Sequence, residues 1–209
     1  MTLVDRANSG LRRVPPWTLY LIAVVPPVYM FIAALTGNLG VDPVQNLEHE
    51  LGELGLQVLI ATLAITPLRR FVGLNLIRFR RALGVIGFAY IFCHLLVWLV
   101  LDVQILSQII SDIAKRPYIT IGMAGFVLLS PLAFTSNNWS VRKLGPRWRK
   151  LHKLFYPAII LGGVHYVMVV KGWQVEPLIY LGVILALLAT RIIPKQAKRP
   201  RDLRQMKEA

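Results

Sequence analysis

Long apolar stretches, separated by short polar and basic segments, make up most of this chain. A window of about 18 to 20 mostly apolar residues is long enough to cross a bilayer as a helix. Such windows predict six transmembrane helices, at residues 17–35, 54–68, 83–101, 119–135, 154–170 and 177–193. The window at 54–68 is short and could extend at either end. The pattern therefore predicts an all-α integral membrane protein, a six-transmembrane-helix bundle between an N-tail at 1–16 and a C-tail at 194–209.

The basic residues are distributed unevenly between the two sides of this predicted bundle. Of the 24 lysines and arginines, 21 lie in the N-tail, in segments 69–82 and 136–153, and from Arg191 onward. Only Lys115, Arg116 and Lys171 fall on the other side. Because positive residues gather on the cytoplasmic side, both termini are predicted to be cytoplasmic. Topology and contact with anionic lipid explain the net charge of +14, so we expect no nucleic-acid partner.

The single cysteine and the positions of the acidic residues exclude several kinds of function. Cys93 is the only cysteine, so the chain has no intrachain disulfide and no CxxCH motif for covalent heme. An amphipathic stretch, QILSQIISDI, in the outer segment 102–118 predicts a helix at the membrane surface. No Asp or Glu lies in the middle of a predicted span, which argues against an ion-coupled transporter.

Two histidines lie at similar depths in two predicted spans. His94 and His165 are each about 11 residues from the cytoplasmic end, or about 16 Å along a helix. These two spans run in the same direction, so the two imidazoles can face one another and ligate one b-type heme. Gly87 and Ala158, each seven residues earlier, share their histidine's face and predict close approach of a macrocycle. Ordinary buried histidines and ordinary helix packing are the alternative reading.

A third histidine, His152, precedes His165 by 13 residues, with Pro157 between them. The position that would supply its partner in the third span holds Arg80 and Arg81 instead. Three roles stay open for His152: ligand of a cytoplasmic-side heme with an unusual or absent second ligand, partner of a propionate, quinone or flavin, or plain interfacial residue. The two arginines could clamp heme propionates or an anionic flavin, or simply belong to a basic loop.

The fourth histidine, His49, lies in the predicted first outer loop, within NLEHELGELG. Three nearby glutamates suggest a metal, but a contiguous run supplies ligands poorly. We interpret His49 either as part of a solvated loop or as a residue for partner docking or proton transfer at the outer face.

Five segments occur together in an order that is specific as a set: ATLAITPLRR, IRFRRALGVIGFAYIFCHLLVW, KRPYITIG, LAFTS and KLGPRWRKLHKLFYPAIILGGVHY. With them, residues 17–193 resemble the MsrQ (YedZ) family, the heme-binding membrane subunits of bacterial periplasmic methionine sulfoxide reductase systems. That family belongs to the wider ferric-reductase-like transmembrane group. The resemblance places the family's heme histidines at His94, His152 and His165, and its outer-loop histidine at His49.

The resemblance also implies a function. It implies a multi-pass protein of the bacterial inner membrane that holds one or two hemes b and is not itself catalytic. Electrons would come from the quinone pool, from a flavin such as FMN, or from a cytoplasmic flavin reductase. They would pass to a periplasmic, molybdopterin-containing, MsrP-like subunit that repairs oxidised proteins. The alternatives are a stand-alone ferric or cupric reductase, a small transporter, and a cofactor-free membrane anchor.

Overall fold

The computed structural model describes residues 2–170 and 174–192, and this part of the chain is built from helices without β-strands. The predicted C-tail at 194–209 and Lys171 lie outside the described residues. The helices are α1 (Leu3–Arg13), α2 (Thr18–Leu35), α3 (Pro43–Pro67), α4 (Arg80–Val97), α5 (Leu106–Lys115), α6 (Pro117–Phe134), α7 (Asn138–Leu144), α8 (Pro146–Leu151), α9 (Phe155–Val169) and α10 (Val175–Ala189). Short π- and 3₁₀-helical turns at Leu68–Val72, Ile77–Phe79, Trp98–Val103 and His152–Leu154 extend the ends of α3, α4 and α9.

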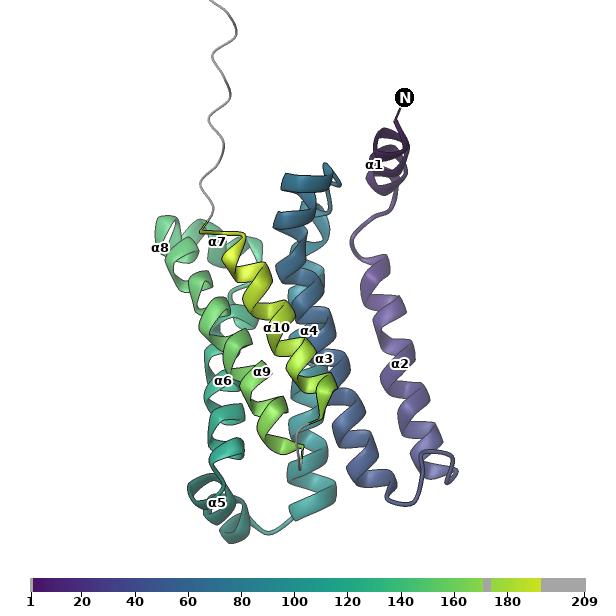
Figure 1. The fold of residues 1–209 in the computed structure, drawn as a ribbon, viewed down its shortest axis with the longest axis vertical. Helices are drawn as coiled ribbons and strands as arrows, with labels where there is room; N and C mark the ends of the chain where they lie inside the picture. The colour runs from purple at the N-terminus through teal and green to yellow at the C-terminus, as the bar shows by residue number, and fades with distance from the viewer. Residues whose placement is uncertain (1, 171–173, 193–209) are drawn as a thin grey trace, which may run out of the picture.

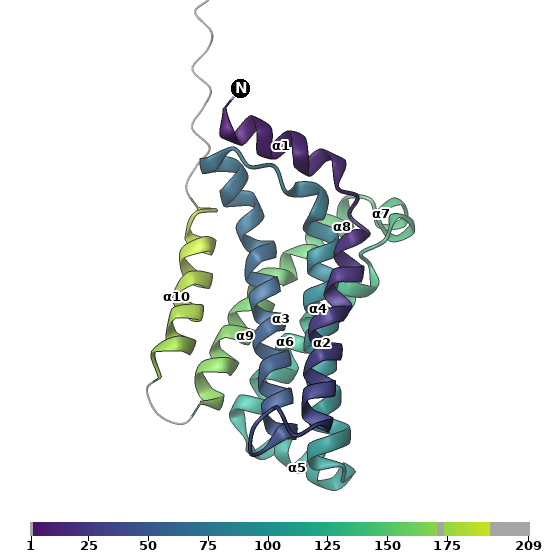
Figure 2. The same cartoon turned by 90° about the vertical axis from the view of Figure 1, so that its right-hand side faces the viewer.

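The long helices α2, α3, α4, α6, α9 and α10 run lengthwise and alternate in direction, and α1 lies across one end (Figures 1 and 2). Within the described residues, four helical segments are long and apolar enough to cross a membrane: Thr18–Leu35, Pro43–Val72, Ile77–Val103 and Pro117–Phe134. They coincide with the first four predicted spans. Helices α9 and α10 coincide with the last two but have 15 residues each. That length is about 22 Å, less than the roughly 30 Å of a bilayer core.

Four of the long helices form a bundle whose arrangement decides where the site lies. The closest pairs are α3 with α4 and α6 with α9. The two pairs pack against each other through contacts of α3 with α9 and of α4 with α6. Consequently α4 and α9 are diagonal across the bundle. Leucines of α3 and α6 pack with residues of α9 and α10 to form the main core, which contains Leu56, Leu59, Leu63, Leu129, Leu132, Phe155, Ala158, Ile159 and Ile184.

The prediction of an outer loop before the second span was wrong in extent, because α3 begins at Pro43. The Asp42 side chain caps this helix by accepting a hydrogen bond from the Gln45 backbone N–H at 3.1 Å. Proline in the first turn is typical of a helix start. Hydropathy windows miss the first three turns of α3 because these turns contain three glutamates and an asparagine. His49 and Glu53 lie in these turns, and are therefore on a helix and not in a loop.

The amphipathic segment of the outer loop is confirmed as a helix, α5, which starts after the left-handed turn at Gln104. Its C-terminal turn carries the ion pair between Asp112 and Arg116, 3.2 Å apart. Helix α2 lies at the edge of the bundle, and of its residues only Ala33 is buried.

Candidate functional site

The structure brings together the two histidines that the sequence placed at one depth. His94 comes from α4 and His165 from α9, the diagonal helices, and their ring centroids are 6.2 Å apart with planes inclined at 70°. The Nδ1 atom of His94 is 2.8 Å from the backbone oxygen of Glu48. The Nδ1 atom of His165 is likewise 2.8 Å from the backbone oxygen of Tyr118.

These hydrogen bonds determine the tautomer of both rings. A carbonyl oxygen only accepts, so each Nδ1 carries a proton that it donates, and each Nε2 keeps its lone pair. This is the arrangement of metal-bound histidines, whose second nitrogen is held by a carbonyl or carboxylate.

A glycine makes room for each of these imidazoles. A Cβ atom on Gly52 of α3 would lie 3.0 Å from Nδ1 of His94, and one on Gly122 of α6 would lie 2.8 Å from Nδ1 of His165. Each glycine is four residues after the residue whose carbonyl accepts the hydrogen bond, so carbonyl and glycine lie on the same face of their helix. Both histidines are thus seated on the backbone of the neighbouring helix.

The ring separation fits a shared metal ion. Two imidazoles that bind one metal at about 2 Å each have centroids roughly 6 Å apart, and the observed value is 6.2 Å. The donor set, two neutral imidazole nitrogens from two helices, is one that heme iron accepts. The residues present therefore fit a bis-histidine heme.

Gly87 and Ala158 lie on the packing side of their helices. A Cβ atom on Gly87 would lie 2.7 Å from Cδ2 of Leu59, so this glycine lets α4 approach α3 closely. Ala158 is buried in the core, and its backbone oxygen faces Gly125 of α6. The structure thus gives both small residues a helix-packing role, and their contact with a cofactor stays a prediction.

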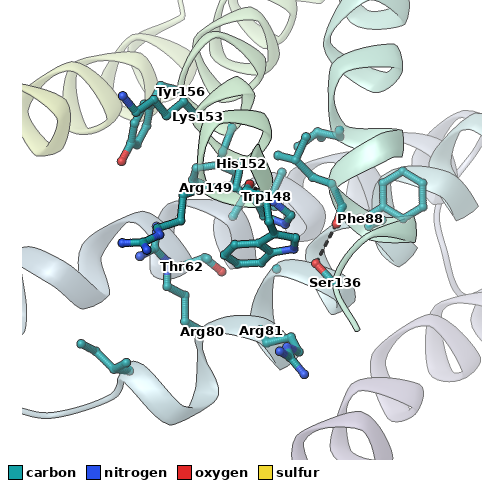
Figure 3. A pocket seen from close by; sticks show the side chains of 17 residues that line it. Thr62, Arg80, Arg81, Phe88, Ser136, Trp148, Arg149, His152, Lys153 and Tyr156 are labelled. Atoms are coloured by element: carbon teal, nitrogen blue, oxygen red, sulfur yellow. Dashed lines mark hydrogen bonds between the residues drawn. The ribbon is translucent and has the colours of Figure 1, made fainter. Parts of the chain in front are cut away.

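His152, Arg80 and Arg81 line one pocket, at the end of the bundle where α7 and α8 lie (Figure 3). Its volume is about 420 Å³, within the range of cofactor sites. Arg149 and Lys153 add positive charge to its wall. Apolar and polar neighbours complete the lining: Leu59, Thr62, Ile77, Gly84, Phe88, Leu129, Leu132, Ala133, Ser136, Trp148, Phe155 and Tyr156.

Trp148 determines how His152 is held. Its indole stacks on the imidazole at a centroid distance of 3.8 Å, and its Nε1–H donates to the Thr135 carbonyl at 2.9 Å. Nδ1 of His152 is 3.1 Å from the Trp148 carbonyl oxygen, so the proton is on Nδ1. Nε2 is buried without a hydrogen-bond partner. Burial lowers the pKa of His152, and the guanidinium groups of Arg80 and Arg81 lower it further, against the opposing effect of nearby backbone carbonyls. His152 is therefore a neutral imidazole with a free nitrogen beside a basic pocket.

Sequence reasoning missed an aromatic group between the two sites. Phe88 lines the pocket and stacks on Phe126 of α6 at 5.5 Å, and Phe92, one turn further along α4, is 6.3 Å from both rings. The stacked rings of Phe88 and Phe126 join α4 to α6, and Phe92, which is 42% exposed, lies at the edge of this group. Their spacing of four residues on α4 was the available signal, but it is also typical of lipid-facing residues.

Arg191 was counted only as a basic residue of the cytoplasmic side. In the structure its guanidinium group donates to the Leu63 carbonyl at 3.0 Å and to the Tyr156 hydroxyl at 3.1 Å. It therefore ties the end of α10 to α3 and to a wall residue of the pocket.

His49 is exposed near the start of α3. It directly follows Glu48, whose backbone carbonyl accepts from His94, and it is near enough to interact electrostatically with both His94 and His165. Throughout residues 2–170 and 174–192, no three His, Cys, Asp or Glu side chains converge as a metal site. The glutamates around His49 therefore do not form one with it, and partner docking stays a prediction.

Comparison with known proteins shows the family to which this chain belongs. A family model described as "Ferric reductase like transmembrane component" matches residues 50–163, more than half of the chain, so the chain belongs to the ferric-reductase-like transmembrane proteins. A protein-methionine-sulfoxide reductase heme-binding subunit MsrQ of Brucella anthropi is 50% identical over 183 residues, which cover 87% of this chain and 83% of that protein. The MsrQ of Brucella ovis is 50% identical over 192 residues, covering 88% and 87%. The chain belongs to the MsrQ family of heme-binding subunits. No solved structure matches it.

Proposed function

We propose that this protein is the membrane heme b subunit of a methionine sulfoxide reductase system and carries electrons across the bilayer to a catalytic partner. The observation that carries the proposal is the pair His94 and His165, whose ring centroids are 6.2 Å apart. The Nδ1–H of each ring donates to a backbone carbonyl. The names of the Brucella relatives, heme-binding subunits of protein-methionine-sulfoxide reductase, support the same function.

The residues of the chain would hold and insulate the cofactor. The Nε2 atoms of His94 and His165 would bind its iron, and the carbonyls of Glu48 and Tyr118 would fix the orientation of both rings. A bound heme supplies one-electron redox chemistry at iron. The phenylalanines Phe88, Phe92 and Phe126 and the surrounding bundle would keep water out of the space between the two sites.

The pocket lined by His152, Arg80 and Arg81 would lie where electrons enter the protein. Nε2 of His152 is free there, and Arg80 and Arg81 offer guanidinium groups for carboxylate or phosphate. We propose that this pocket holds a second heme, FMN or a quinone head group. The electrons would come from the quinone pool or from a cytoplasmic flavin reductase.

The proposed topology follows from the charges. The alternating long helices and the basic residues at the α1 end support six spans with both termini in the cytoplasm of a bacterial inner membrane. His94 and His165 then lie nearer the periplasmic face, where a molybdopterin-containing, MsrP-like partner would accept electrons. Methionine sulfoxide would be reduced on that partner.

A pyridine hemochrome assay with oxidised and reduced spectra tests the proposal. Wild-type protein should show low-spin heme b, and His94→Ala and His165→Ala should lose it. His152→Ala should remove at most the signal of a second heme. His49→Ala, at an exposed position, is the matched control and should leave the heme content and the spectrum unchanged. A wild-type protein that stays colourless when expressed with ample heme would refute the proposal.

The description of the matching family favours a second function, a stand-alone ferric reductase. Reduced protein in proteoliposomes distinguishes the two. Oxidation by ferric citrate as fast as by the catalytic partner would support the metal reductase, and oxidation by the partner alone would support the electron-transfer subunit.

A further inference from the structure

A second hollow of about 350 Å³ lies between α1 and the segment that joins α3 to α4. We call it the arginine groove. It is lined by Asn8, Arg12, Arg69, Asn75, Ile77 and Arg78. None of the chemistry assigned above uses it. It is separate from the pocket of His152, with which it shares only Ile77.

Specific hydrogen bonds hold α1 over this segment. The Asn8 side chain donates to the Gly73 carbonyl at 3.1 Å and accepts from the Asn75 backbone N–H at 2.8 Å. Nη1 of Arg78 donates to the Arg12 carbonyl, 66 residues away in sequence, and to that of Leu11. α1 thus lies across the end of α3 (Figure 2), and the groove is a product of the tertiary structure.

Among residues 2–170 and 174–192, no carboxylate forms an ion pair with the arginines that line the groove. Among the described residues, the one ion pair joins Arg116 to Asp112 at the opposite end of the bundle. The carboxylate of Asp5, on α1 itself, is occupied by the backbone N–H and hydroxyl of Thr2, at 2.9 and 2.8 Å. Three guanidinium groups that converge without a carboxylate favour an anion. Their planar fork suits phosphate oxygens, with which arginine forms paired hydrogen bonds.

The apolar side chains beside the groove indicate what carries the phosphate. Ile77 lines it and is 41% exposed, and Phe71 and Val72, at the end of the same membrane segment as Arg69, are 59% and 54% exposed. A phosphate site bordered by exposed apolar residues at a membrane-helix end matches a lipid, whose head group and acyl chains are adjacent. We infer that the arginine groove binds the phosphate group of an anionic phospholipid, in the leaflet on the α1 side of the membrane.

Native mass spectrometry of the full-length protein in detergent tests this inference, with phosphatidylglycerol as the probe and zwitterionic phosphatidylcholine as the reference lipid. The test variant is Arg12→Gln with Arg69→Gln, which leaves the bonds of Arg78 to α1 intact. The control is Arg6→Gln with Arg13→Gln, which also removes two positive charges but at α1 residues that do not line the groove. We expect the test variant to bind phosphatidylglycerol at least about tenfold more weakly, and the control to change by less than about threefold.

Three results would overturn the inference: equal losses in both double variants, which would mean general charge attraction; no loss in either; or phosphatidylcholine bound as tightly as phosphatidylglycerol. A further arm uses inorganic phosphate. If it competes with phosphatidylglycerol at equal concentration, the groove serves a soluble phosphate compound and the lipid assignment fails. The heme spectrum of each variant shows that it is folded, and it does not depend on the groove, so failure here is distinguishable from failure of the proposed function.

Discussion

Gly52 lies directly under the imidazole of His94, so close that a Cβ atom on the glycine would be 3.0 Å from Nδ1. Gly122 has the same relationship to His165, at 2.8 Å. In both cases the carbonyl four residues earlier, of Glu48 or Tyr118, accepts the Nδ1 proton. The same seat thus occurs twice, on the two closest helix pairs of the bundle.

Replacing either glycine by alanine should weaken heme binding. The added methyl group displaces the imidazole from the backbone carbonyl, and loss of such an outer partner costs about 10- to 100-fold in metal affinity. Heme retention and the low-spin spectrum of Gly52→Ala and Gly122→Ala measure this. Gly162→Ala and Gly182→Ala are matched controls, because the atom nearest to a Cβ on Gly162 is 3.5 Å away and no atom lies within 4 Å of a Cβ on Gly182. Wild-type heme content in the Gly52 and Gly122 variants would show that the seat is not needed.

Gly87→Ala separates helix packing from cofactor contact. Its Cβ would meet Leu59 Cδ2 at 2.7 Å, so α4 would be pushed from α3. Overpacking of this kind costs about 1–3 kcal/mol. We expect a lower melting temperature with an unchanged heme spectrum in the protein that remains folded. A changed spectrum at unchanged stability would instead support the predicted contact with the macrocycle.

Acidification should act on His152. Its pKa in the folded state is below the ordinary value of 6.5, so the imidazole is neutral at pH 7 and protonation favours the unfolded chain. The stability that depends on the neutral ring is therefore present above about pH 6.5 and is lost as the pH falls through the lowered pKa. Melting curves between about pH 8 and pH 5 should show a steeper decline for wild type than for His152→Asn. Parallel declines would contradict this prediction.

Glu53 is an acid that the sequence placed in a loop and the structure places on a membrane-spanning segment. Its carboxylate accepts hydrogen bonds from the hydroxyls of Tyr180 at 2.8 Å and Tyr166 at 3.4 Å, and from Gln57 Nε2 at 2.8 Å. Glu53→Leu would leave the two tyrosine hydroxyls without this acceptor, at a cost of about 1–3 kcal/mol, whereas Gln57 Nε2 keeps its bond to the Tyr180 hydroxyl. Glu53→Gln keeps an acceptor and should cost less.

Thermal unfolding of the Glu53 variants in detergent measures both effects. Glu50→Leu, an exposed change of the same type on the same helix, is the control and should be close to neutral. If Glu53→Leu is as stable as that control, the tyrosine cluster does not support the packing of α9 and α10 on α3.

The sequence alone predicted the long apolar helices and the pairing of the two histidines, because both follow from local patterns, but the short helices α1, α7 and α8 lie in segments that it assigned to a tail and a loop. A membrane span is a run of apolar residues, and two histidines at equal depth on parallel spans can meet wherever those spans face each other. The start of α3 was misplaced for a related reason. Its first turns carry Glu, Asn and His49, which hydropathy reads as loop, whereas the Asp42 cap and Pro43 mark a helix start.

The tertiary structure decided everything that depends on which helices are neighbours. No pattern within α4 or α9 shows that His94 is seated on Gly52 and His165 on Gly122, that Gly87 faces Leu59, or that Glu53 meets two tyrosines more than 100 residues away. Hydrophobic periodicity indicates that a face is buried but not against what, because apolar attraction has no direction. The close fit of small residues and the direction of hydrogen bonds select one partner for each face, and these exist only once the bundle has packed.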